Sequence, residues 1–375
     1  MNTMQRDKRI DLIKGIGIIL VVGAHAGVPH SAMISMFHMA IFFIASGYCY
    51  KDQHSNSLKE LGVFVVKKVK TLYLPFVLWN VFFLAIRDIL LWLNIYTNDG
   101  AFLDNIPGNS YGLITHLSKN EFVASLKEIV KFQGEQQLEG ASWFLRALFS
   151  ASIFFAFWDF LLKKIISKYI SEARIISAVA FLMIGNEIGQ KNIILRLNLH
   201  GIFAIYFLFV LGLYLKQWKI LMHRMDWRFN VLLLSFSLMV LRALEGLVSV
   251  NLNDSVFSSI QLFVLVSILG WLLLWSMATI ISKGRKITGV IQYIGKHSMS
   301  ILMMHFVCFK VITYLQVKLY SYPSYALAAF PCLNNTDAWC YAYVIAGVVL
   351  PILVNYIFIQ LKDKSYNYIV RKKKW

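Results

Sequence analysis

The sequence predicts an all-α integral membrane protein, with about ten transmembrane helices around a central polar cavity and both termini in the cytoplasm. Hydrophobic residues make up 58% of the 375 residues and charged residues only 15%, whereas soluble domains carry about 25% charged residues. Apolar stretches of about 20 residues, the length that crosses a bilayer, recur along the whole chain. We therefore expect one transmembrane domain over residues 1–375, with no fused soluble domain.

Ten stretches have the apolar composition of a spanning helix. They are residues 10–29, 32–50, 72–94, 143–162, 175–189, 198–215, 229–249, 256–281, 298–318 and 340–361. The longest connection, about residues 95–140, is acidic. Within it, residues 120–132 have apolar side chains at helical spacing, so we expect a helix that lies in solvent, on the membrane surface or over a cavity.

The charge distribution predicts the orientation of these helices. The net charge is +18, which in a soluble protein would suggest nucleic acid. Here the basic residues gather at the even-numbered junctions and the C-terminal tail, and the positive-inside rule assigns those segments to the cytoplasm. Examples are Lys51, Lys59, Lys67, Lys68, Lys70, Lys163, Lys164, Arg174, Lys216, Arg228, Lys283, Arg285 and Lys372. We expect contact with membrane lipids and no nucleic-acid partner.

The first stretch holds two ionisable residues on one helix face. Lys14 and His25 are eleven positions apart, which is three helical turns plus about 20° and a rise of roughly 16 Å. Lys14 then lies near the cytoplasmic surface and His25 about half a bilayer deeper. Ionisable groups at that depth usually face a cavity or a partner, although a lone histidine can simply satisfy a neighbouring carbonyl group.

The second stretch continues this polar face. His38, Phe42, Ser46 and Cys49 recur at helical spacing and form one stripe. Other polar residues fall in the outward halves of the stretches, and they suggest a cavity that opens outward. These are Arg146 at the start of the fourth stretch and Arg242 with Glu245 in the seventh, where an ion pair within the helix is the simpler interpretation.

The four cysteines form no CxxC pair, and no metal site is predicted. Cys332 and Cys340 share an expected outer loop, where they could form a disulfide or remain free thiols.

Five segments together resemble the acyltransferase-3 family, in order and over nearly the whole chain. They are RIDLIKGIGIILVVGAH (9–25), MFHMAIFFIASGY (36–48), KKVKTLYLPF (67–76), SWFLRALF (142–149) and IGKHSMSILMMH (294–305). The resemblance implies an acyltransferase of the bacterial inner membrane. Such an enzyme takes an acyl group, here expected to be acetyl, from cytoplasmic acyl-CoA and transfers it to a hydroxyl of a cell-surface glycan or a lipid-linked sugar precursor.

The resemblance carries over residue by residue. The family's basic residue with a histidine further along the helix matches Lys14 and His25, and its His-x-x-x-Phe-Phe-x-x-Ser-Gly pattern matches the segment from His38 to Gly47. Its basic pair before a proline matches Lys67 and Lys70. Lysine stands at positions where arginine is frequent, but it remains a good phosphate ligand.

Acyl transfer to a hydroxyl needs a base and groups that stabilise an oxyanion. We expect His25 to be the base, with His38 orienting it, binding the acceptor or stabilising the oxyanion. The donor's phosphates are expected at Lys14, Lys67 and Lys70, with Lys68 beside them, and the acceptor at Ser46, Arg146 and Glu245. No cofactor is expected to be permanently bound. A transporter or flippase of a glycan or lipid remains the alternative, whereas a polysaccharide polymerase would need more arginines in the 95–140 loop.

Overall fold

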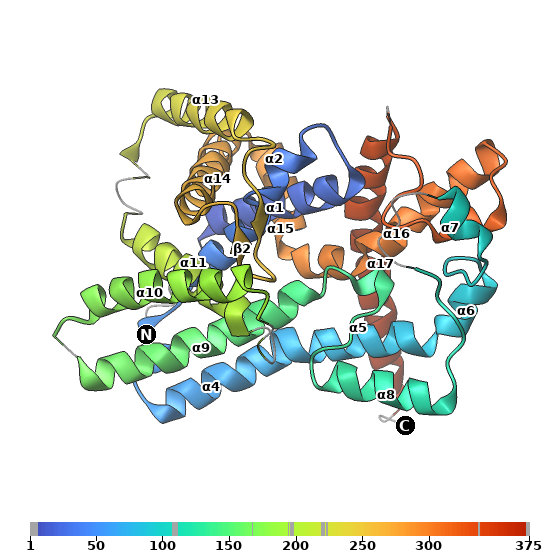
Figure 1. Cartoon of the computed structure of the whole chain (residues 1–375), viewed down its shortest axis with the longest axis horizontal. Coiled ribbons are helices and arrows are strands. Elements are labelled where there is room, and N and C mark those ends of the chain that lie inside the picture. Colours follow the sequence, from blue (N-terminus) through green and yellow to red (C-terminus); the bar gives the residue numbers. More distant parts are fainter. Residues whose placement is uncertain are drawn as a thin grey trace.

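The computed structural model describes residues 7–106, 112–166, 168–193, 195, 199–218, 222, 224–336 and 338–372. Helices dominate these residues (Figure 1). The first half contains α1 (Lys8–Ala26), α2 (Ser31–Ser35), α3 (His38–Tyr48), η1 (Asp52–Ser55), α4 (Leu58–Lys68), η2 (Val69–Tyr73), α5 (Leu74–Ala85), α6 (Arg87–Trp92), α7 (Ala101–Asn105), α8 (Lys119–Val130), η3 (Gln137–Glu139) and α9 (Trp143–Ile165).

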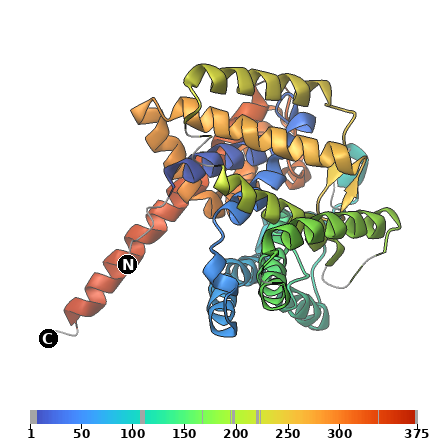
Figure 2. The same cartoon turned by 90° about the vertical axis from the view of Figure 1, so that its left-hand side faces the viewer.

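The second half contains α10 (Ile170–Gln190), α11 (Leu199–Gln217), α13 (Trp227–Ala243), α14 (Ile260–Ile281), α15 (Arg285–Lys296), α16 (Ser298–Leu319), η5 (Ser324–Ala328) and α17 (Trp339–Lys372). The described part has one small sheet, in which β1 (Val250–Asn251) pairs antiparallel with β2 (Val256–Phe257). Figure 2 shows the end of α17 projecting away from the other helices.

Every stretch predicted to span the membrane contains helix, so the all-α class is confirmed for the described residues. Five segments are long and apolar enough to cross a membrane: 31–48, α9, α14, α16 and the first 22 residues of α17. Four predicted spans differ in shape from a single helix. The second is divided between α2 and α3, and the third breaks at Ile86 into α5 and α6. The seventh ends its helix at Ala243, and the eighth begins with β2 before α14. The ten-span count remains a prediction.

Helix α1 lies at the centre of the fold, which explains how it carries charge and is still buried. It packs against α3, α14, α15, α16 and α17, and 12 of its 19 residues are buried. Asp7 caps its start by accepting a hydrogen bond from the backbone N–H of Arg9. Gly27 ends it with a left-handed φ of 70°, and the N–H of Val28 donates to the carbonyl of Gly23. The sharp turn that follows leads to α2 and α3.

Helix α3 packs closely against α11 because two glycines allow the backbones to approach. A Cβ atom on Gly47 would collide with the carbonyl of Phe209, and a Cβ atom on Gly212 would collide with the carbonyl of Ile44. Gly47 directly follows Ser46, so this contact fixes the position of the polar stripe on α3.

Helices α4 and α5 form one continuous rod through the π-helical turn η2. The Ser57 side chain caps α4 by accepting from the N–H of Glu60. Pro75 has no N–H to donate back along the rod, and the π-helical turn η2 lies directly before it. The predicted loop helix is confirmed as α8, with a capping box between Ser118 and Glu121. It packs against α5 (Figure 1).

Candidate active site

A cavity of about 240 Å³ lies between α1, α3, α9, α16 and the α4–η2 rod. Its wall is mainly apolar, with polar side chains from Lys14, Ser46, Lys68, Thr71 and Ser298. The apolar lining consists of Ile18, Val21, Met39, Phe42, Leu72, Phe144, Leu148, Met299 and Leu302. The sequence suggested a central polar cavity that opens outward. This cavity is mainly apolar instead, and its charged groups are Lys14 and Lys68, which the charge pattern assigns to the cytoplasmic side, whereas Arg146, Arg242 and Glu245 do not line it.

The residues that line the cavity change from polar to apolar along the helices. On α1 it runs from Lys14 to Val21, and on α3, which comes back after the turn, it runs from Ser46 to Met39. Each run rises over seven residue steps, or about 10 Å. Each has a polar residue at one end and an apolar residue at the other, so the cavity has a polar mouth and an apolar inner end.

Three histidines lie just beyond the apolar end. His25 follows Val21 by one turn of α1, His38 directly precedes Met39 on α3, and His305 follows Leu302 by three residues on α16. The rings of His25 and His305 stack with centroids 5.4 Å apart and planes at 28°. His38 lies within electrostatic range of His25. The structure thus brings together the two predicted histidines and adds a third.

The hydrogen bonds of His38 determine which of its nitrogens is free. Its Nδ1 lies 3.0 Å from the carbonyl oxygen of Ile34. Because a carbonyl can only accept, Nδ1 carries the proton, and Nε2 of the neutral ring is an acceptor. His38 is 8% exposed, so it can accept a hydrogen bond from a bound hydroxyl. In this form it has no second N–H to offer an oxyanion.

Of the predicted cationic residues, Lys14 lines the polar mouth but Lys70 does not. Lys70 is exposed and lines neither this cavity nor the adjoining one. Lys68 lines both cavities, and its ammonium lies 5.2 Å from the ring centroid of Phe64. Burial, with a smaller contribution from Lys67, lowers the pKa of Lys68 to about 8.

The adjoining cavity, of about 190 Å³, shares Ser46, Lys68 and Thr71 with the first. It also contains Lys67 and an aromatic wall of Tyr50, His54, Phe64 and Phe209. Burial and the nearby lysines, Lys67 first, lower the pKa of His54 and favour its neutral form. A cationic mouth beside an aromatic wall suits an anionic ligand that also has a flat or apolar part.

The family described as "Acyltransferase domain" matches residues 7–358. The chain belongs to the acyltransferase-3 family. The resemblance drawn from the five sequence segments is therefore confirmed, and the protein is a membrane acyltransferase in general terms. Searches of curated proteins and of solved structures found no match.

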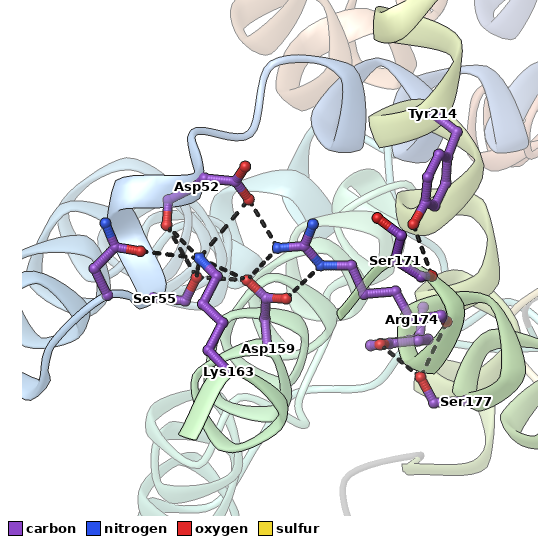
Figure 3. Close-up of polar contacts among 10 residues, drawn as sticks. Asp52, Ser55, Asp159, Lys163, Ser171, Arg174, Ser177 and Tyr214 are labelled. Atoms are coloured by element: carbon purple, nitrogen blue, oxygen red, sulfur yellow. Dashed lines mark hydrogen bonds and ion pairs between the residues drawn. The ribbon is translucent and has the colours of Figure 1, made fainter. Parts of the chain in front are cut away.

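Near the lysine end of the cavities, an ionic cluster joins η1, α9 and α10 of this acyltransferase (Figure 3). Arg174 of α10 donates from Nε to Asp159 Oδ1 at 2.6 Å and from Nη2 to Asp52 Oδ1 at 2.8 Å. The hydroxyl of Ser55 donates to Asp159 Oδ2, and Lys163 lies 3.3 Å from the same oxygen. Asp159 is fully buried, so its charge is compensated entirely by these partners.

Arg146 and Glu245, the two other residues predicted to bind the acceptor, line neither of the two cavities described above. Arg146 pairs with Glu135 at 2.9 Å. Burial raises the pKa of Glu135 to about 7, although Arg146 acts in the opposite direction. Glu139 is 1% exposed, and its carboxylate makes no hydrogen bond to a described residue. Burial first, and Glu135 second, raise the pKa of Glu139 well above its usual value.

Glu245 lies in a second ionic cluster. It pairs with Arg242 at 3.0 Å, as the sequence spacing predicted, and also with His30 of the turn after α1, again at 3.0 Å. His30 has a left-handed φ of 62°. These contacts join the turn after α1 to the end of α13 and account for Glu245 without a ligand.

None of the four cysteines is in a disulfide, so Cys332 and Cys340 are not bonded to each other. Across the described ranges, no three His, Cys, Asp or Glu side chains are grouped to hold a metal ion.

Proposed function

We propose that this acyltransferase moves an acyl group, in the first instance acetyl, from cytoplasmic acyl-CoA to a hydroxyl of a cell-surface glycan or a lipid-linked sugar precursor. In this proposal the protein spans the bacterial cytoplasmic membrane ten times and keeps both termini in the cytoplasm. It forms one transmembrane domain and holds no permanently bound cofactor.

The observation that carries the proposal is the order of groups along one cavity. Lys14 and Lys68 stand at the polar mouth, and His25 lies beyond the apolar inner end. A ligand with phosphates and a long arm would place its phosphates at the lysines and its reactive end near the histidine. The rise of about 16 Å from Lys14 to His25 matches an extended arm better than a compact substrate.

The reaction balances without any further reagent. The acceptor oxygen attacks the thioester carbon, and His25 takes the hydroxyl proton. The carbon–sulfur bond then breaks, and the thiolate of CoA receives the proton from His25, which returns to its neutral form. A base in this position contributes about 10²–10⁴-fold to the rate.

In this proposal His38 has a narrower role than the sequence left open, and Ser46, which the sequence assigned to the acceptor, is assigned to the donor instead. The free Nε2 of His38 binds an acceptor hydroxyl. The Ser46 hydroxyl donates to the carbonyl of Phe42 at 2.8 Å, so its oxygen is left as an acceptor, and we assign it to an N–H or O–H of the donor's arm.

The test is transfer by the purified protein. Wild type in nanodiscs, given acetyl-CoA and a glycan extract, should release free CoA and form acetylated sugar that mass spectrometry detects. His25→Gln should bind acetyl-CoA but transfer at least about 100-fold more slowly. The control is His116→Gln, because His116 is exposed and pairs with Asp88 at 2.8 Å. A well-folded His25→Gln protein with normal turnover would remove His25 from the mechanism. Failure of wild type to bind any acyl-CoA would favour a transporter.

A further inference from the structure

His305 is a buried histidine, and only one of its two ring nitrogens has a hydrogen-bond partner among the described residues. Its Nδ1 lies 3.1 Å from the carbonyl oxygen of Ile301 and 2.9 Å from that of Leu302. Both partners are acceptors, so Nδ1 carries the proton and Nε2 of the neutral ring has a lone pair. The residue is fully buried, and Nε2 has no hydrogen-bond partner among the described residues. A buried acceptor nitrogen without a hydrogen bond lowers the stability of the folded protein, unless a water or a ligand donates a hydrogen bond to it.

The ring of His25 also lacks a hydrogen-bond partner among the described residues, and as a base it needs an acceptor for its N–H. Its ring forms no side-chain hydrogen bond to the described part of the chain, and its recorded contacts are aromatic: the stack on His305 and an edge contact with Phe306 at 4.9 Å. A neutral histidine acts as a base only if the proton occupies the nitrogen that faces away from the substrate. A hydrogen bond at that second nitrogen normally selects this tautomer.

We propose that His305 is a positioning residue for His25, acting through one bridging water. The water accepts the N–H of His25 and donates to Nε2 of His305, which satisfies both groups at once. The two rings lie beside each other with centroids 5.4 Å apart, and His305 Nε2 has no direct hydrogen-bond partner among the described residues, so a single water is the smallest group that can link them. The inference rests on the proposed role of His25 as base.

In other enzymes a carboxylate hydrogen-bonded to the catalytic histidine selects its tautomer. Here the water and the neutral ring of His305 would select the tautomer without adding a negative charge. Because the water holds the N–H of His25, the unprotonated nitrogen of His25 is left for the acceptor hydroxyl. When His25 becomes positively charged during transfer, the same water, which accepts its N–H and donates to the neutral His305, stabilises the cation.

Four variants separate this role from simple packing. His305→Phe keeps a ring of similar size but removes the acceptor, and His305→Gln places an amide oxygen near the position of Nε2. His305→Asn places its amide near the position of Nδ1 instead. The control is His297→Phe, because His297 also hydrogen-bonds a carbonyl through Nδ1, that of Tyr293 at 2.9 Å, but is more exposed and lies at the start of α16.

Two measurements are made on each variant in nanodiscs: the ¹⁵N spectrum of labelled histidine, which reports the tautomer of His25, and acetyl transfer. We expect one dominant His25 tautomer in wild type, His305→Gln and His297→Phe, and a mixture in His305→Phe and His305→Asn. The turnover number should fall about 10- to 100-fold in the last two, as for other residues that orient a functional histidine, while the KM for the donor stays unchanged.

A wild-type tautomer and turnover in His305→Phe would overturn the inference. So would equal losses in folded His305→Gln and His305→Asn, which would mean that only the imidazole ring itself matters. If His305→Phe fails to fold, the comparison of Gln with Asn decides. If wild type shows no acetyl transfer, the proposed function fails, but the spectra still test the pairing of His25 with His305.

Discussion

Two lysines only two residues apart should differ sharply in their importance for donor binding. Lys68 lines both cavities, whereas Lys70 is exposed and lines neither. Residues two apart on a helix point to different faces. We therefore expect Lys68→Ala to weaken acetyl-CoA binding strongly and Lys70→Ala to leave it nearly unchanged, although the family pattern had singled out Lys70.

The size of the effect follows from the position of Lys68. A hydrogen bond to a charged group contributes about 1.5–3 kcal/mol net, which corresponds to about a 10- to 150-fold rise in Kd. Burial lowers the pKa of Lys68 to about 8, so about nine-tenths of the molecules still carry the charge at pH 7. Donor affinity should therefore decline as the pH rises past about 8, and Lys68→Ala should remove this decline.

The assay is calorimetric titration of each variant with acetyl-CoA at low and moderate salt. The contact with Lys68 is partly buried and should persist at moderate salt, whereas any contribution of Lys70 through long-range attraction should disappear. Equal losses in Lys68→Ala and Lys70→Ala would show that the lysines act only as a general positive surface. Unchanged affinity in Lys68→Ala would refute the assignment of the polar mouth to the donor's phosphates.

Three further predictions concern the fold. Asp159→Asn should lower the free energy of unfolding by about 3 kcal/mol, because Arg174 would lose its buried charge partner and keep only its pair with the exposed Asp52, and thermal unfolding of the purified variant checks this. Burial raises the pKa of Glu135 to about 7 in the folded protein, from the 4.5 that is usual for glutamate. Between these two pH values, Glu135 therefore holds its proton more often in the folded protein than in the unfolded chain. Stability should therefore fall as the pH rises through that window, by an amount on the order of 3 kcal/mol. In Glu135→Gln this fall should be smaller; an identical pH profile in both proteins would contradict it. Gly47→Val should lower the melting temperature, because its side chain would push α3 away from α11, and a melting temperature equal to that of wild type would count against the close contact.

Much of the fold could be predicted because apolar length and helical spacing are local properties of the sequence. The helices α9, α14 and α16 fall where the apolar stretches do, and α8 falls where amphipathic spacing placed a loop helix. The turn after α1 was also predictable, since Gly27 and Pro29 favour a chain reversal.

The parts that were not predicted depend on contacts between distant segments. The sequence contains three lysines at 67, 68 and 70, and only the packing of the α4–η2 rod against α3 and α9 decides which of them reaches the cavity. His305 closes a segment that carried the family resemblance, but its importance comes from a stack on His25, which is 280 residues earlier in the chain. Glu245 and His30, which also pair, are 215 residues apart.

The ionic cluster around Asp159 links these distant contacts to the proposed site. Asp52 and Ser55 belong to η1, which directly precedes α4, and η1 also carries His54 of the adjoining cavity. Lys163 adds hydrogen bonds to the Asp52 carbonyl and to Ser55. Anchoring η1 to α9 and α10 therefore fixes where α4 begins, and the position of Lys68 at the end of α4 follows from it. Loss of this anchor in Asp159→Asn should accordingly weaken donor binding as well as stability, even though Asp159 lines neither cavity.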